Sequence, residues 1–115
     1  MAQALVTGGA GFIGSHLVRG LLELGHRVRV LDDLSTGSEA NLEGLEVEVV
    51  VGDIRDQEVV RHGVKGVRWV IHQAALVSVP GSLEDPVRCY EINLHGTLNL
   101  LWAAQEAGVE RVVLA

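Results

Sequence analysis

Hydrophobic residues along the chain alternate between short continuous runs and stripes with helical spacing. The runs are apolar and rich in β-branched residues, which is typical of buried strands. They cover residues 4–6, 28–31, 47–51, 69–71 and 112–114. Strands without an internal polar alternation belong to a sheet that is covered on both faces.

Helical patterns separate these runs. From Phe12 to Leu24 apolar residues recur every three or four positions, which predicts an amphipathic helix whose buried stripe includes Ile13 and Leu24 and which ends at Gly25. A short helix is expected over 56–62. A long helix is expected to begin within 82–86, with Pro86 in its first turn, and to end near Gly108.

Strands that alternate with helices predict a parallel sheet with right-handed crossovers. We therefore expect an α/β fold with a doubly wound parallel sheet of five strands. The chain has 115 residues and no linker rich in proline or serine, so residues 1–115 are expected to form one domain.

Composition narrows the classes of function. The net charge of −6 argues against nucleic acid as a partner, and no apolar run reaches the ~20 residues of a membrane span. A single cysteine, Cys89, cannot form an internal disulfide and fits a reducing, cytoplasmic setting. The five histidines lack zinc-site spacing, so no metal site is expected.

The strongest local signal is the segment Thr7–Gly14, which follows a predicted strand and opens a predicted helix. Gly9, Gly11 and Gly14 fit one glycine spacing of dinucleotide-binding loops, and Gly8, Gly11 and Gly14 fit another. Either spacing allows a sharp turn, a close approach of a diphosphate and tight packing of the helix on the strand. The amides near Phe12 and Ile13 would face the phosphates, although an ordinary strand-to-helix turn is the alternative.

Asp32 ends the second predicted strand, 18 positions after Gly14. That position suits a carboxylate that accepts hydrogen bonds from the adenosine ribose, which favours NAD over NADP because the carboxylate would repel a 2′-phosphate. A solvated loop acid or a helix cap is the alternative for Asp32.

Five motifs in order resemble the extended short-chain dehydrogenase/reductase family, and within it the NAD-dependent nucleotide-sugar epimerases and dehydratases. They are TGGAGFIG at 7–14, LDDLSTG at 31–37 (with Asp33 where asparagine is common), GDIRD at 52–56, HQAA at 72–75 and a helix with Tyr90, Asn93, 96–97 and 99–101. The resemblance covers essentially the whole chain. It implies a Rossmann-type fold and NAD as the cofactor.

The resemblance also assigns roles to residues. Asp53 and Ile54 would meet the adenine, 72–75 would border the nicotinamide ribose, and Asn93 would steady the backbone near the active site. The turn at 35–37 would bind ribose or phosphate oxygens. Simpler alternatives are a cap and a core residue for 53–54, strand-to-loop packing for 74–75, a surface turn for 35–37 and an ordinary surface or core position for Asn93. The positions expected to contact the cofactor are Gly8, Gly11, Phe12, Ile13, Gly14, Asp32, Asp33, Ser35, Thr36, Gly37, Asp53, Ile54, Gln73, Ala74, Ala75, Val77 and Asn93.

In this family a Ser or Thr after the fifth strand and a Tyr-xxx-Lys pair on the next helix carry the reaction. Here Tyr90 is followed four positions later by Leu94, and Lys65 is distant in sequence. The resemblance thus implies the N-terminal, cofactor-binding portion of an epimerase, with no catalytic residue of its own and with the catalytic helix and the substrate domain absent. A nucleotide sugar would be the substrate of the full-length protein, and the long helix implies a homodimer.

Two other interpretations remain open. One is a stand-alone NAD-binding or interaction module. The other is a different oxidoreductase of the extended family that acts on sterols or flavonoids.

Overall fold

The computed structural model describes residues 3–35, 37–74 and 86–114. Five parallel strands form one sheet in the order β3-β2-β1-β4-β5. The strands are β1 (Gln3–Thr7), β2 (Arg27–Asp32), β3 (Glu48–Val51), β4 (Trp69–His72) and β5 (Arg111–Leu114). The predicted doubly wound α/β sheet is confirmed, and each strand lies within two residues of its predicted bounds.

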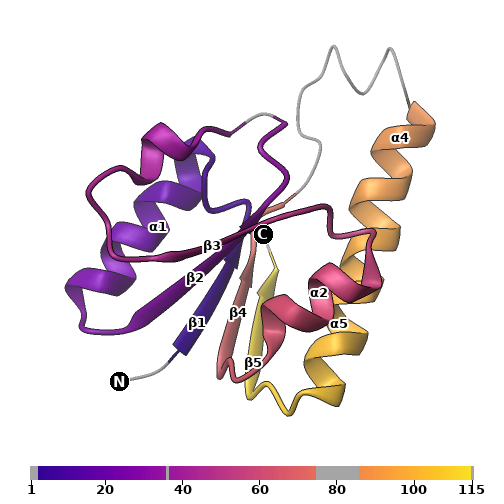
Figure 1. The fold of residues 1–115 in the computed structure, drawn as a ribbon. Helices are drawn as coiled ribbons and strands as arrows, with labels where there is room; N and C mark the ends of the chain where they lie inside the picture. The colour runs from indigo at the N-terminus through magenta and orange to yellow at the C-terminus, as the bar shows by residue number, and fades with distance from the viewer. Residues whose placement is uncertain (1–2, 36, 75–85, 115) are drawn as a thin grey trace.

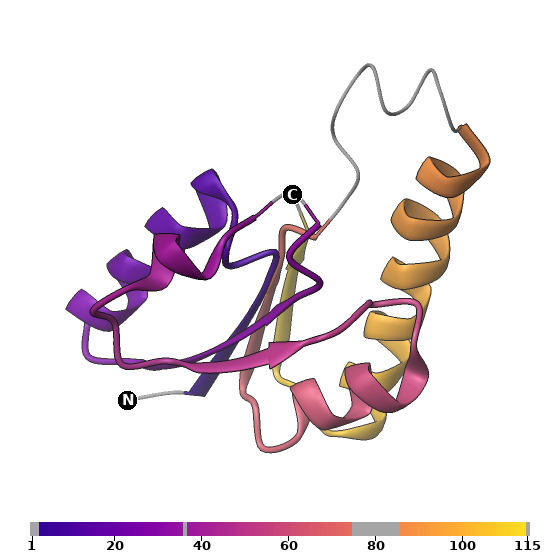
Figure 2. The same ribbon diagram turned by 45° about the horizontal axis from the view of Figure 1, so that its top comes forward.

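Helices cover both faces of the sheet. The elements are α1 (Phe12–Glu23), the 3₁₀ helix η1 (Glu39–Leu42), α2 (Gln57–Val64), α4 (Pro86–Tyr90), the π-helical segment η2 (Glu91–His95) and α5 (Gly96–Glu106). Figure 1 shows α1 and η1 on one side of the sheet and α2 and α5 on the other, and Figure 2 shows the same layers after rotation.

Alternate side chains of the strands supply the two halves of the core. Leu5 of β1 packs in a cluster with Val60 of α2 and Leu100 of α5. Its neighbour Val6 points to the opposite face and belongs to the cluster that contains Val18 of α1. This alternation is why the strands are continuously apolar.

Helix α1 buries a different set of residues from the one that its sequence stripe predicts. Gly14, Ser15 and Val18 are buried, whereas Ile13 and Leu24 are exposed. The predicted stripe differs from the buried surface at both ends of the helix. The first turn packs on the glycine loop through its small residues, and at the other end Leu24 is the C-cap before Gly25, which has φ of +88°.

The predicted long helix is confirmed from Pro86 onward, and residues 82–85 lie outside the described residues. It is not regular throughout, because η2 interrupts the α-helical hydrogen-bond pattern. π-helical turns are rare and often lie at functional sites. Within η2 the Asn93 carbonyl accepts a hydrogen bond from the Thr97 hydroxyl at 2.6 Å.

The strand order creates a topological switch point at one end of the sheet, and the region beyond it is the candidate crevice. In the sheet β2 lies on one side of β1, and β4 lies on the other side with β5 beyond it. The connection that follows β1 therefore runs in the opposite direction from the one that follows β4, and the two diverge at the carboxyl ends of these strands. In open α/β sheets ligands bind at such a switch point. No helix among the described residues is long and apolar enough to cross a membrane.

Candidate functional site: a dinucleotide crevice

The glycine loop between β1 and α1 forms the floor of the crevice. Gly8 has φ of +71°, and a Cβ on it would lie 2.9 Å from the Ala74 backbone nitrogen. A Cβ on Gly14 would overlap the Gly8 carbonyl oxygen and lie 2.9 Å from the Gly9 Cα. The turn and the tight helix packing thus fall on Gly8 and Gly14. Gly9 is equally confined, because a Cβ on it would lie 2.8 Å from the Val30 side chain, so the packing fits both glycine spacings.

The first turn of α1 presents amides to the crevice. The first amide of α1 to bond within the helix is that of Ser15, which donates to the Gly11 carbonyl at 2.9 Å. The amides of Phe12, Ile13 and Gly14 precede it and have no acceptor within the helix. Together with the helix dipole, these amides favour an anion in front of this turn.

Asp32 is 7% exposed and its carboxylate faces this loop. Oδ2 accepts a hydrogen bond from the Ala10 amide at 2.9 Å, and Oδ1 accepts one from the Leu34 amide at 2.8 Å. A carboxylate oxygen has two lone pairs, so each oxygen can accept one further hydrogen bond. The geometry therefore leaves acceptor capacity for two hydroxyl groups beside the glycine loop.

The turn after β2 closes over the same loop. Gly37 packs so closely that a Cβ on it would lie 2.7 Å from the Ala10 carbonyl carbon. Asp33 and Ser35 are exposed, and the Asp33 carboxylate accepts the Ser35 amide at 2.9 Å, as in a surface turn. Thr36 lies outside the described residues.

Asn41 is a residue that the sequence analysis missed. Its side-chain amide donates to the Ala10 carbonyl at 2.7 Å, and the Ser38 amide donates to the same oxygen at 3.0 Å. Both bonds fix the loop from η1, which the sequence did not predict. A Ser-x-x-Asn pattern in a polar stretch gives no signal of a contact 31 positions away.

The loop after β3 carries the residues expected near adenine. Asp53 is half-buried and pairs with Arg55 through two hydrogen bonds from Nε, at 3.1 and 3.0 Å. The Ile54 side chain is buried in the core against Gly96, so its core alternative is confirmed. Asn99 of α5 donates to the Ile54 and Arg55 carbonyls at 3.2 and 2.9 Å, a clamp that the sequence did not predict.

The segment after β4 is anchored on Thr7 at the end of β1. The Thr7 hydroxyl accepts hydrogen bonds from the Gln73 and Ala74 amides at 3.0 and 3.1 Å. This brings the 73–74 backbone against Gly8, as close as a glycine permits. Ala75 and Val77 lie outside the described residues.

Asn93 lies at the surface of the long helix. It is exposed in η2, and its side chain donates to the Cys89 sulfur at 3.3 Å. The Asn93 carbonyl accepts a hydrogen bond from the Thr97 hydroxyl, which in turn contacts His72 of β4. Asn93 is therefore linked to the sheet through its backbone carbonyl.

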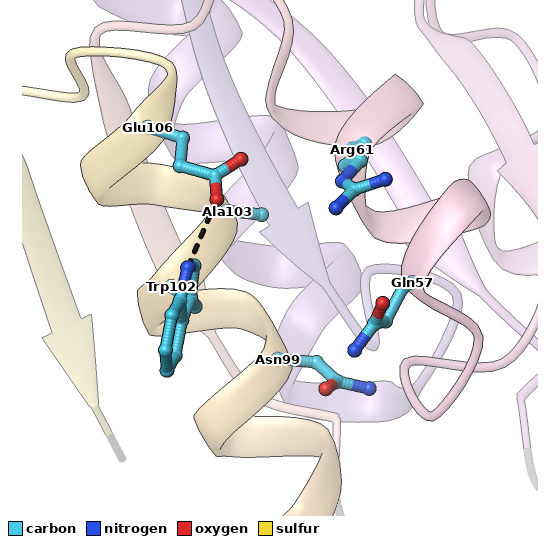
Figure 3. A pocket seen from close by; sticks show the side chains of 6 residues that line it. All are labelled: Gln57, Arg61, Asn99, Trp102, Ala103 and Glu106. Carbon is cyan, nitrogen blue, oxygen red and sulfur yellow. Dashed lines mark hydrogen bonds between the residues drawn. The ribbon is translucent and has the colours of Figure 1, made fainter.

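A pocket of about 360 Å³ lies away from the crevice, between α2 and α5. Figure 3 shows its lining, which comprises Gln57, Arg61, Asn99, Trp102, Ala103 and Glu106. Trp102 is 71% exposed, and its indole N–H donates to the Glu106 carboxylate at 2.9 Å. None of the residues predicted to bind the cofactor lines this pocket. The described residues hold no cluster of metal-ligating side chains.

Comparisons with known proteins agree with this geometry. The chain is 44% identical over 112 residues to a putative UDP-glucose 4-epimerase of Methanocaldococcus jannaschii, covering 96% of this chain and 36% of that protein. It is 39% identical to a 3-beta-hydroxysteroid dehydrogenase of Mycolicibacterium neoaurum, covering 98% of this chain and 31% of that protein. The chain thus spans about a third of the length of these relatives.

A solved structure shares the fold. The Thermus thermophilus UDP-glucose 4-epimerase, crystallised as a complex with NAD, superposes with a TM-score of 0.89 at 48% identity over 96% of this chain and 36% of that one. The sequence model of the NAD dependent epimerase/dehydratase family matches residues 4–115. With its Rossmann-like sheet and its glycine loop, the chain belongs to the NAD dependent epimerase/dehydratase family.

Proposed function

We propose that the crevice binds NAD, with the diphosphate over the first turn of α1 and the adenosine ribose on Asp32. The observation that carries this proposal is the orientation of the Asp32 carboxylate, which bonds the Ala10 amide of the glycine loop at 2.9 Å. A carboxylate beside a cluster of free amides suits a ligand with a ribose diol next to a diphosphate. The same negative charge disfavours a 2′-phosphate, so we expect preference for NAD over NADP.

The two ends of the cofactor have supporting residues on either side. Asp53, half-buried after β3, is the candidate for the adenine amino group, and Asn99 fixes the loop that carries it. The 73–74 backbone is the candidate for the nicotinamide ribose, because Thr7 holds it beside Gly8. Bound NAD would supply an acceptor and donor of hydride.

For the whole protein we propose epimerisation of a nucleotide sugar, in the manner of a UDP-glucose 4-epimerase. Support comes from the identity of 44% with the Methanocaldococcus jannaschii relative and 48% with the Thermus thermophilus structure. We further propose that this chain binds and orients the cofactor, while residues outside it act on the sugar.

Two measurements test the proposal in turn. Calorimetric titration of the chain with NAD and with NADP is expected to show saturable binding that is tighter for NAD. Conversion of UDP-glucose by the whole protein, followed by nuclear magnetic resonance of the sugar, is then expected without net consumption of NAD. Absence of NAD binding would refute the cofactor assignment, and NAD binding without sugar turnover would refute the epimerase assignment alone.

A second candidate reaction is oxidation of a hydroxysteroid, which the 39% identity to the Mycolicibacterium neoaurum dehydrogenase favours. Both reactions would use the same cofactor crevice, so the discrimination lies in the product. Steroid oxidation consumes NAD and builds up NADH absorbance, whereas epimerisation returns the hydride to the sugar. Assaying the whole protein with both substrates separates the two.

We also propose that the protein self-associates through α5. Leu98 and Trp102 are 55% and 71% exposed on this helix, and Leu94 precedes them by one turn on η2. Exposed apolar patches of this kind mark contact surfaces. Sedimentation of the protein is expected to show a dimer that Leu98→Glu weakens and that Gln105→Glu, on the exposed surface of the same helix, leaves intact.

A further inference from the structure

His72 lies at the carboxyl end of β4, between the sheet and the long helix. The residue is 7% exposed, and its ring contacts a hydroxyl on each side. Nδ1 lies 2.6 Å from the Thr7 hydroxyl of β1, and Nε2 lies 2.8 Å from the Thr97 hydroxyl of α5. The imidazole therefore bridges two elements that flank the crevice.

The hydrogen bonds of Thr7 fix the direction of the first contact. Its oxygen accepts the Ala74 amide at 3.1 Å and shares the Gln73 amide with the Thr7 carbonyl, each at 3.0 Å, so both lone pairs of the hydroxyl are engaged. The Thr7 proton is then left to donate to Nδ1, so Nδ1 is the acceptor.

The hydrogen bonds of Thr97 fix the direction of the contact between its hydroxyl and Nε2 of His72. Its hydroxyl donates to the Asn93 carbonyl at 2.6 Å, so toward His72 it can only accept. Nε2 therefore carries a proton. Taken together, the two contacts require the neutral imidazole with its proton on Nε2.

We propose that His72 is a positioning residue, which as the neutral Nε2–H tautomer orients the Thr7 hydroxyl so that it holds the Gln73 and Ala74 amides beside the glycine loop. The proposal rests on the proposed binding of NAD in that crevice, because it assigns to His72 the placement of the backbone proposed to meet the nicotinamide ribose. Through Thr97 the same ring is also linked to the Asn93 carbonyl of η2.

A charged ring could not do this. A proton on Nδ1 would need an acceptor, and both lone pairs of the Thr7 hydroxyl are engaged. The hydroxyl would therefore lose its bond to the Ala74 amide, or its share of the Gln73 amide, which would keep only the Thr7 carbonyl. Burial lowers the pKa of His72 from its usual 6.5, which keeps the ring neutral near neutral pH. Its register neighbours on β1 and β5, Thr7 and Leu114, and its partner Thr97 on α5 are all uncharged.

The tautomer can be observed directly in the chain without any ligand. Long-range proton–nitrogen correlation spectra of the chain labelled at histidine nitrogen are expected to show Nε2 protonated and Nδ1 bare for His72 at neutral pH. A proton on Nδ1, a charged ring or a mixture of tautomers would overturn the proposal, whatever the outcome with NAD.

The positioning role is tested by the pH dependence of NAD affinity. In the native chain we expect the affinity to fall as the pH is lowered from about 8 toward the pKa of His72, by roughly tenfold or more once the ring is charged. His72→Asn places an amide near Nδ1 that accepts from Thr7 at any pH, so its affinity is expected to vary little with pH. His62→Asn, an exposed histidine of α2, serves as the matched control and is expected to keep the native pH profile.

A second pair of variants guards against loss of folding. Thr7→Ser keeps the hydroxyl and is expected to retain the native affinity within about threefold, whereas Thr7→Val is expected to lose roughly tenfold or more. A flat native profile, a native-like profile in His72→Asn, or equal affinity of the two Thr7 variants would overturn the positioning role. Failure of the native chain to bind NAD near pH 8 would instead refute the proposed function and leave the tautomer result standing.

Discussion

The close packing of α1 on the glycine loop makes Gly14→Ala the most informative single substitution. A methyl group at this position overlaps the Gly8 carbonyl oxygen and lies 2.9 Å from the Gly8 carbonyl carbon and the Gly9 Cα. Non-bonded carbons approach to about 3.5 Å, so the helix must move by more than half an ångström relative to the loop. Overpacking of this degree costs about 1–3 kcal/mol, against a gain of about 1 kcal/mol from the helix propensity of alanine.

Gly20→Ala on the same helix provides the matched control, because a Cβ there meets nothing within 4 Å. We expect Gly20→Ala to raise the free energy of unfolding by about 0.5–1 kcal/mol and to leave NAD affinity unchanged. Gly14→Ala is expected to lower the free energy of unfolding by up to about 2 kcal/mol and to weaken NAD binding more than tenfold. Urea denaturation and calorimetric titration measure the two quantities. Equal stability and equal NAD affinity of the two variants would refute the packing argument.

Three further predictions follow from individual side chains. Asp32→Ala is expected to weaken NAD binding by about 10- to 100-fold, since a hydrogen bond to a charged group contributes about 1.5–3 kcal/mol, and to reduce the preference for NAD over NADP. Calorimetric titration with both cofactors measures the two affinities, and an unchanged ratio of NAD to NADP affinity would contradict the assignment. Asn99→Leu is expected to destabilise the fold by about 1–3 kcal/mol and to weaken NAD binding, because the Ile54 and Arg55 carbonyls lose their hydrogen-bond donor. Urea denaturation measures the free energy of unfolding, and a variant as stable as the native chain would refute the role of Asn99 as a clamp. Because burial lowers the pKa of His72, the unfolded chain takes up a proton below about pH 6.5 that the folded chain does not, so this residue makes stability fall with falling pH by at most about 1.4 kcal/mol per pH unit. Urea denaturation of the native chain and His72→Asn from about pH 7.5 to about pH 5 is expected to show a shallower slope in the variant, and parallel slopes would count against the lowered pKa.

Local patterns in the sequence were sufficient to predict the fold and the position of the glycine loop and Asp32. Buried parallel strands read as apolar runs, and the glycine spacing and Asp32 are set by steric demands within one strand–helix–strand unit. The structure confirms these elements, and the Asp32 carboxylate faces the loop.

Contacts between distant segments could not be predicted in this way. The Thr7–His72 hydrogen bond joins residues 65 positions apart, and the Asn99–Ile54 bond joins residues 45 positions apart. Helical periodicity also misplaced Ile13, because what a first turn buries depends on the loop against which it packs. The same holds for Asn93, whose apolar surroundings in sequence give no sign of the exposed π-helical turn that carries it.

The central claim is that the first turn of α1 and Asp32 together hold a dinucleotide, and a crystal structure of the protein with NAD tests it most directly. The account predicts diphosphate oxygens within hydrogen-bond distance of the Phe12 and Ile13 amides, and ribose hydroxyls on the Asp32 carboxylate. A cofactor bound elsewhere, such as in the pocket between α2 and α5, or an Asp32 carboxylate turned away from the ribose, would contradict it.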